Sequence, residues 1–127
     1  MSDAIRALQG ESYINLETFK RSGEGVKTPI WFAHQGTDLV FMTNGKSWKC
    51  KRLARNSACK LAACGVAGGI KGPWFDGVCV ELTDGAEVAA AADLLLKKYG
   101  LQWKLLLAGA GLAGKKKDHA YYRITPA

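Results

Sequence analysis

The stretch LVFMTNGKSWK, residues 39–49, decides the fold of this chain, because it joins a buried strand to a basic helix. Residues 39–43 are apolar without polar alternation, which predicts a short strand with both faces buried. Gly45 follows in a turn. Residues 46–56 contain neither Gly nor Pro, and Asn44 or Ser47 can cap their start, so a short helix is expected there.

The junction between this strand and this helix has the chemistry of a phosphate site. Thr43 and Ser47 supply hydroxyl groups, Lys49 supplies an ammonium group, and the helix start supplies free N–H groups. Each charge-assisted hydrogen bond is worth roughly 1.5–3 kcal/mol. These residues taken alone also fit a solvated basic helix that holds no ligand.

Positive charge is concentrated around the junction. Residues 39–75 carry seven Lys and Arg side chains and no Asp or Glu, whereas the whole chain carries 18 basic and 11 acidic side chains. The rest of the chain is therefore balanced, with 11 of each sign. A local field of one sign predicts an anionic partner. Nucleic acid is the less favoured partner, because Trp48 is the single aromatic residue interleaved with the basic helix.

Other segments predict a mainly antiparallel sheet. Residues 13–20 and 26–34 form a hairpin pattern around a turn at residues 21–25. Two later runs, at residues 60–66 and 74–82, also have strand patterns, the second with Val78, Val80 and Leu82 on one face, and residues 121–125 form a closing strand. Gly68 and Gly69 predict a tight turn.

Helical patterns complete the expected fold. Residues 88–99 have apolar side chains at three- and four-residue spacing and end at Gly100, which predicts an amphipathic helix. Residues 101–108 are expected to add a short helix and residues 109–118 a loop. In the basic helix, Trp48 and Leu53 are expected to anchor one side. Strands with two or three helices indicate a small barrel or α+β domain.

A glycine pattern at residues 109–114 matches GxGxxG but does not predict a dinucleotide fold. That fold requires a following helix, a parallel return strand and an acidic residue about 20 positions later. Only 13 residues follow Gly114. The three lysines at 115–117 also lack the spacing of a Walker loop. This segment is expected to be a loop.

Length and composition predict one domain over residues 1–127, with no membrane span and no secretory signal, in the cytoplasm. Four cysteines, at positions 50, 59, 64 and 79, form no CxxC pair, and the chain has only two histidines. Free, mostly buried thiols and no metal site are therefore expected.

Thr43, Ser47 and Lys49 form the pattern T-x3-S-x-K. This pattern resembles the phosphate-binding segment of the pyridoxamine 5'-phosphate oxidase-like split-barrel flavoproteins. One branch, the small F420-dependent oxidoreductases, resembles the chain over nearly its whole length. The matching segments are Thr28-Pro29-Ile30-Trp31, Ser47 to Arg52, Ala63-Cys64, Gly72-Pro73-Trp74, Tyr99 to Trp103, and Arg123-Ile124-Thr125-Pro126.

The resemblance implies a six-stranded antiparallel split β-barrel, a homodimer, and F420 or FMN bound at the subunit interface. It assigns three groups of cofactor-binding residues: phosphate contacts at Thr43, Ser47 and Lys49, basic follow-up positions at Lys51 and Arg52, and a strand backing the ring at Thr28, Pro29 and Trp31. Pro29 lacks an N–H donor, so its strand is expected at a sheet edge or at an interruption facing a ligand.

The sequence departs from this family at two places. Trp48 stands where many flavin-binding relatives carry Arg, and Asn56-Ser57 replaces a common Asn-Pro. The first departure removes one phosphate contact of the FMN-binding relatives and weakens an FMN assignment. The resemblance to the F420-dependent branch places F420 modestly ahead of FMN.

The expected function is an oxidoreductase that transfers hydride between the cofactor and an unknown small molecule. The cofactor performs that chemistry, so no catalytic acid or base is required or assigned. His34 is expected to be a structural histidine. The tryptophans are expected to be core or interface anchors, with stacking on the cofactor ring as the alternative for Trp31 or Trp74. Two alternatives stay open: a flavin, F420 or haem binding protein without turnover, and a nucleic-acid binder that uses residues 46–56.

Overall fold

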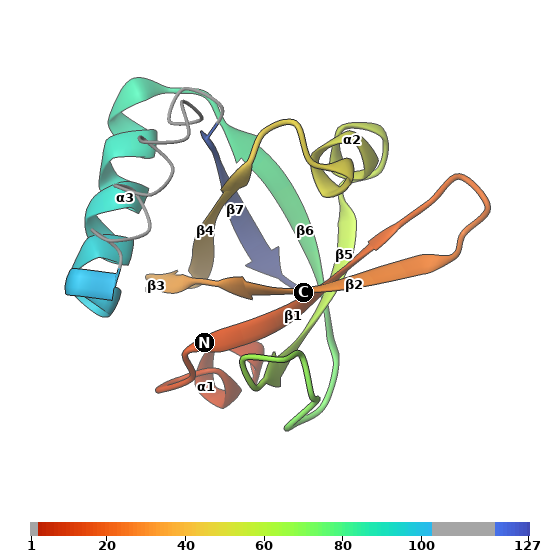
Figure 1. Ribbon diagram of the computed structural model, residues 1–127, viewed down its shortest axis with the longest axis horizontal. Helices are drawn as coiled ribbons and strands as arrows, with labels where there is room; N and C mark the ends of the chain where they lie inside the picture. The colour runs from red at the N-terminus through yellow and green to blue at the C-terminus, as the bar shows by residue number, and fades with distance from the viewer. Residues whose placement is uncertain (1–2, 103–118) are drawn as a thin grey trace.

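A computed structural model describes residues 3–102 and 119–127 of the chain (Figure 1). The described elements are, in chain order, α1 Asp3–Ala7, β1 Tyr13–Phe19, β2 Gly25–Trp31, β3 Ala33–Gln35, β4 Asp38–Asn44, α2 Trp48–Arg55, β5 Ala58–Cys64, β6 Phe75–Leu82, α3 Gly85–Tyr99 and β7 His119–Pro126. None of the helices in these residues is long and apolar enough to cross a membrane.

The strands form one sheet in the order β2-β1-β5-β6-β7-β4-β3, and every pairing is antiparallel. The first hairpin pairs Tyr13 with Trp31 and Phe19 with Gly25. Its tip is closed by the N–H of Lys20, which donates to the carbonyl of Glu24 over 2.9 Å, while Gly23 takes a positive φ of 91°. The predicted hairpin is confirmed.

The expected six-stranded barrel differs from the sheet formed by the described residues, which has seven strands and is not closed by hydrogen bonds. One cause is Phe32, which separates β2 from β3. Its N–H donates to the Tyr99 hydroxyl over 2.8 Å, and its carbonyl lies 2.8 Å from that same hydroxyl. The side chain of Tyr99 thus takes the place of a strand partner at Phe32. The two ends of the sheet are consecutive segments of the chain.

Two apolar clusters hold the elements together. The larger one fills the interior of the curved sheet with Ile14, Leu16, Phe41, Leu61 and Ile124, all of which are almost fully buried. Helices α1 and α2 add side chains to it from different sides, below and above the strands in Figure 1. Ile5 of α1, a helix that the sequence patterns missed, and Leu8 just after it are fully buried in this cluster.

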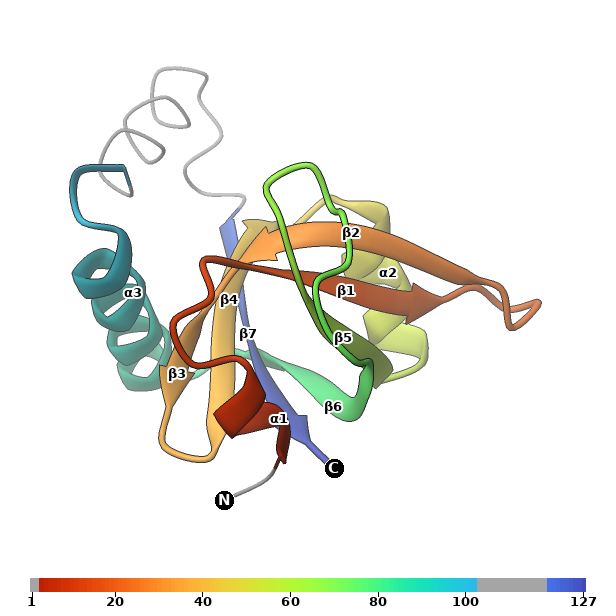
Figure 2. The same cartoon turned by 90° about the horizontal axis from the view of Figure 1, so that it is seen from below.

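The smaller cluster lies under α3. Helix α3 stands beside β3 and β4 in both views (Figure 2), and its Ala91 and Leu95 pack on Val40 of β4 and Leu82 of β6. The predicted helix is confirmed, with Asp84 accepting from the N–H of Glu87 at its start and Gly100 at its end. The second helix expected at residues 101–108 lies outside the described residues from residue 103 onward, and so does the whole loop expected at residues 109–118, including the GxGxxG segment.

One expectation about a side chain was wrong. Trp48 was expected to anchor α2, but 71% of its surface is exposed, and the buried residues of that helix are Cys50 and Leu53. Val78, Val80 and Leu82 do share one face of β6, as expected, because the register of β6 with β7 is unbroken. On that face Leu82 is buried in the cluster under α3, whereas the two valines are about half exposed. Pro29 does lie on an edge strand, as expected, because β2 pairs only with β1 in the described sheet.

Candidate functional site

Helix α2 begins at a turn that leaves its first N–H groups free of side-chain caps. Asn44 closes the turn, because its side-chain oxygen accepts from the N–H of Lys46 over 2.9 Å and its carbonyl accepts from the N–H of Ser47 over 3.0 Å. Ser47 is the N-cap residue, but its hydroxyl makes no capping bond and donates to the Cys50 sulfur over 3.4 Å. The uncapped N–H groups can bind an anion.

Lys49 lies against the end of β4. Its Nζ donates to the Thr43 hydroxyl over 3.0 Å, and Thr43 is 9% exposed. Within the described residues, no carboxylate lies within ion-pair distance of Lys49. Burial, and secondarily the charge of Arg52, lowers the pKa of Lys49 below its usual value. The structure thus brings Thr43, Ser47 and Lys49 together around a half-buried cation that has no acidic partner among the residues described.

Two arginines fix α2 to β1. The Nε of Arg52 donates to the Thr18 hydroxyl over 2.6 Å, and an Nη of Arg55 donates to the carbonyl of Phe19 over 2.7 Å. The basic face of α2 is therefore held beside the β1–β2 hairpin. An ordered guanidinium group loses little additional freedom when it binds an anion.

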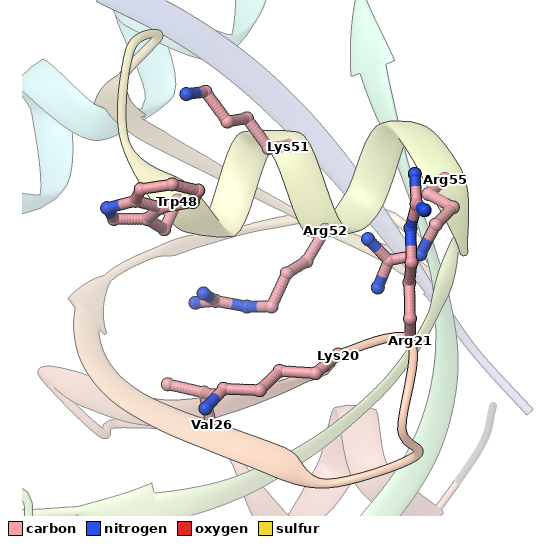
Figure 3. A pocket seen from close by; sticks show the side chains of 7 residues that line it. All are labelled: Lys20, Arg21, Val26, Trp48, Lys51, Arg52 and Arg55. Carbon is pink, nitrogen blue, oxygen red and sulfur yellow. The ribbon is translucent and has the colours of Figure 1, made fainter.

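A pocket of about 600 Å³ lies between this face of α2 and the hairpin (Figure 3). Five of its seven lining residues are cationic and none is acidic; they are Lys20, Arg21, Val26, Trp48, Lys51, Arg52 and Arg55. The ammonium group of Lys51 also lies 4.3 Å from the centre of the Trp48 ring. The pocket therefore suits an anionic ligand with a flat apolar part.

The β2 residues assigned by the resemblance divide between the two faces of that strand. Thr28 shares a face with Val26, which lines the pocket, whereas Pro29 and Trp31 point to the opposite face because side chains alternate along a strand. Trp31 stacks on Tyr99 of α3 with ring centres 4.5 Å apart. Trp31 is therefore an anchor for α3 in this chain, and cofactor contacts by all three residues stay predictions.

The sequence patterns missed Lys20 and Arg21 as pocket residues. Both lie at the tip of the first hairpin, where the sequence predicted the end of a strand for Lys20 and a turn from Arg21 onward. Their approach to α2 depends on the pairing of β1 with β2 and on the bonds of Arg52 and Arg55 to β1. No local signal in residues 20–25 encodes that approach.

The remaining candidate groups have structural surroundings. His34 is bonded through Nε2 to the carbonyl of Ile5 over 3.0 Å, as expected of a structural histidine. All four cysteines are buried and free, which confirms the prediction for the thiols. Among the residues that the structure describes, no three His, Cys, Asp or Glu side chains are grouped as a metal site would require.

Comparison with known proteins gives a match only at the level of structure. No protein-family model matches the sequence, and no curated protein matches it. A pyridoxamine 5'-phosphate oxidase-like protein from Listeria innocua has a TM-score of 0.67 at 13% identity, over 97% of this chain and 90% of that one. A FAD-binding protein from Mesorhizobium loti has a TM-score of 0.70 at 18% identity, over 100% and 91%.

The matched structures differ in what they bind. The haem storage protein HutZ from Vibrio cholerae has a TM-score of 0.70 at 13% identity, over 98% of this chain and 88% of that one. An F420 reductase has a TM-score of 0.60 at 17% identity, over 100% and 95%. At these identities the likeness establishes the fold alone. The antiparallel sheet and the three helices of the described residues, taken with these matches, show a mainly β fold with helices like that of the pyridoxamine 5'-phosphate oxidase-like proteins.

Proposed function

We propose that this protein binds a flavin or deazaflavin, F420 or FMN, with the cofactor's phosphate group held by Thr43, Ser47 and Lys49. The proposed activity is that of an oxidoreductase transferring hydride to or from a small molecule. The proposal combines the resemblance of the sequence to F420-dependent oxidoreductases with the geometry at the start of α2.

One observation carries the proposal most directly. The Nζ of Lys49 is half-buried 3.0 Å from the Thr43 hydroxyl, beside uncapped N–H groups and without a carboxylate partner among the described residues. A desolvated ammonium group without a counter-ion is costly. A phosphate ester supplies the missing charge and accepts bonds from the hydroxyl, the ammonium and the helix N–H groups together.

The chain's own residues supply position and charge. When bound, the isoalloxazine or deazaflavin ring supplies hydride transfer. Lys49 and the hydroxyls of Thr43 and Ser47 would fix the phosphate end, and the bonds of Arg52 and Arg55 to β1 keep α2 in place. Thr28 lies on the face of β2 that is turned toward the pocket, where it is suited to contact a bound ligand.

A homodimer belongs to the proposal, because the resemblance places the cofactor at a subunit interface. The outer face of β6 supports this arrangement. Val78 and Val80 on that face are 48% and 50% exposed, although both are apolar. A second copy that covered them would bury this apolar area.

The first test is a titration of the purified protein with FMN, F420 and haem under the same conditions, followed by visible absorption. Binding of FMN or F420 in preference to haem supports the proposal. Tight binding of haem without binding of FMN or F420 would show that the protein is a haem binder. Binding of none of the three ligands would contradict both flavin binding and haem binding.

The Lys49→Ala variant tests the site. Loss of one charge-assisted bond is expected to cost roughly 1.5–3 kcal/mol of binding free energy, which is about 10- to 150-fold in affinity. The matched control is Lys60→Ala, since Lys60 is an exposed cation of the same acid-free stretch and pairs with Asp76 at 4.0 Å. Equal losses in the two variants would place the phosphate elsewhere.

A further inference from the structure

The pocket between α2 and the β1–β2 hairpin is a second place where an anion can bind, separate from the group formed by Thr43, Ser47 and Lys49. We propose that it binds a nucleoside diphosphate group, with the base on Trp48 and the phosphates on Arg21, Arg52 and Arg55. This inference stands on the pocket itself and does not require the proposed flavin function.

The charge of the pocket favours a ligand with several negative charges. Its lining carries five cations, of which Lys20 alone has a carboxylate partner in the described residues, at 3.0 Å from Glu24. Arg55 and Arg52 use one hydrogen bond each to hold β1. Figure 3 shows Arg21 on the hairpin and Arg55 on α2 pointing toward one another, although both are positively charged. A diphosphate between them would offset that repulsion and accept paired bonds from the guanidinium groups.

Trp48 adds a surface for an aromatic ring. It is the one aromatic side chain among the described residues that line the pocket, and 71% of its surface is exposed. The ammonium group of Lys51 lies 4.3 Å from the ring centre on one side, which leaves the other side for a planar ligand. Stacking of a base on an aromatic side chain is worth about 1–3 kcal/mol.

The shape of the site favours a small nucleotide over a nucleic-acid strand. Its volume of about 600 Å³ lies within the range typical of small-molecule pockets, which is roughly 300–1,000 Å³. A strand-binding surface would need several aromatic residues along a groove. Trp48 is the single aromatic residue that lines this pocket in the part of the chain described by the structure.

The test is isothermal titration calorimetry of the full chain with ADP, pyrophosphate and adenosine in phosphate-free buffer. ADP is expected to bind more tightly than either of the other two. Trp48→Gln is expected to lower the affinity for ADP to that for pyrophosphate while leaving the affinity for pyrophosphate unchanged. Arg21→Gln is expected to weaken both by about tenfold or more, as loss of one charge-assisted bond implies.

Lys60→Gln serves as the control for loss of a positive charge outside the pocket. The two variants in the pocket replace exposed side chains and are expected to fold normally, and urea titration checks that they do. Equal affinity for ADP and pyrophosphate in the unchanged protein would overturn the proposal. Tighter binding of single-stranded oligothymidylate than of ADP, with a steep loss in salt, would also overturn it.

Competition separates two sources of the nucleotide. If ADP displaces FAD but binds together with FMN, the pocket holds the adenosine half of a dinucleotide cofactor. If ADP binds without displacing either flavin, it represents a separate nucleotide substrate. The failure of this proposal leaves the Lys49 site untouched, because that site is tested with FMN, F420 and Lys49→Ala.

Discussion

At the scale of single residues, Lys49 is the most important group of the proposed phosphate site, because its surroundings make the ammonium group responsive to pH and to anions. It is bonded to Thr43 and half-buried, and burial lowers its pKa. A bound phosphate favours the charged form and raises that pKa again. Anion binding and protonation of Lys49 are therefore linked.

This linkage predicts that phosphate affinity falls as pH rises through the lowered pKa of Lys49, since only the charged amine attracts the anion. The fall is expected at lower pH than for an ordinary lysine, whose pKa is about 10.4. Titration of FMN or F420 from about pH 7 to about pH 10 measures it. In Lys49→Arg the guanidinium stays charged, so the decline should disappear. A decline of the same size in both proteins would show that another group titrates.

Cys59 provides a second prediction at this scale. Burial, with a contribution from Asp76, raises the pKa of the Cys59 thiol to about 12, and burial also raises the pKa of Cys79. Thiolate is the reactive form, so at about pH 8 these thiols should react slowly with iodoacetamide in the native protein. All four cysteines should react quickly in urea. Rapid labelling of Cys59 in the native protein, located by peptide mass spectrometry, would contradict this.

The grouping of Thr43, Ser47 and Lys49 was predictable from sequence, because those residues are four and two positions apart at a strand-to-helix junction. The contribution of Arg21 was not, since it depends on how a hairpin tip meets a helix some 30 positions later. The expected burial of Trp48 was wrong. The short helix α2 has few apolar residues from which to identify its buried face, and Cys50, not Trp48, lies on that face with Leu53.

At the scale of elements, Tyr99 joins α3 to the sheet. Its hydroxyl accepts from the N–H of Phe32 over 2.8 Å and lies 2.7 Å from the carbonyl of Ser12, to which it donates. The ring also stacks on Trp31. Burial raises the pKa of Tyr99 to about 12, so the hydroxyl stays protonated and able to donate at neutral pH.

Tyr99→Phe keeps the ring and removes these bonds. The backbone groups of Phe32 then lose their partner, which is expected to lower the free energy of unfolding by about 1–3 kcal/mol. Urea denaturation measures the change. Tyr121→Phe is the control, since Tyr121 packs under the same helix and has no hydroxyl bond among those the structure gives. An equal loss in both variants would mean that the hydroxyl bonds of Tyr99 contribute nothing specific.

Most elements were predictable from local sequence patterns, and the exceptions depend on contacts between residues far apart in the chain. The hairpin, α2, α3 and the last strand were predicted from periodicity, turn residues and caps. The break between β2 and β3 was not, because Phe32 is held by a side chain 67 positions away. The short α1 has only five residues, and its place is set by burial of Ile5 in the core.

At the scale of the whole molecule, the exposed valines of β6 bear on assembly. Val78 and Val80 pair across the sheet with Thr125 and Arg123 of β7, and both lie on the outer face. If this face meets a second copy, Val78→Lys with Val80→Lys should convert a dimer to a monomer in light scattering. Val66→Lys, at an equally apolar residue that is 71% exposed in a loop, should leave the mass unchanged. A wild-type protein that is monomeric at all concentrations would contradict the dimer.

The fold class was predictable from the sequence, whereas the strand order and the open form of the sheet were not. Alternating and buried strand patterns indicate an antiparallel sheet with helices, but the order β2-β1-β5-β6-β7-β4-β3 depends on long-range pairing that no local pattern encodes. The expected number of six strands became seven because one strand is interrupted at Phe32.

The most direct measurement of the central claim compares ligands that differ only in the phosphate. FMN and riboflavin, and F420 and its chromophore without the phosphate side chain, are titrated into the unchanged protein and into Lys49→Ala. We predict that the phosphate raises affinity for the unchanged protein. Lys49→Ala should lower the affinity for FMN and F420 by about 10- to 150-fold while leaving the affinity for riboflavin and the bare chromophore unchanged. An equal loss for ligands with and without phosphate would contradict the assignment of Thr43, Ser47 and Lys49 as the phosphate site.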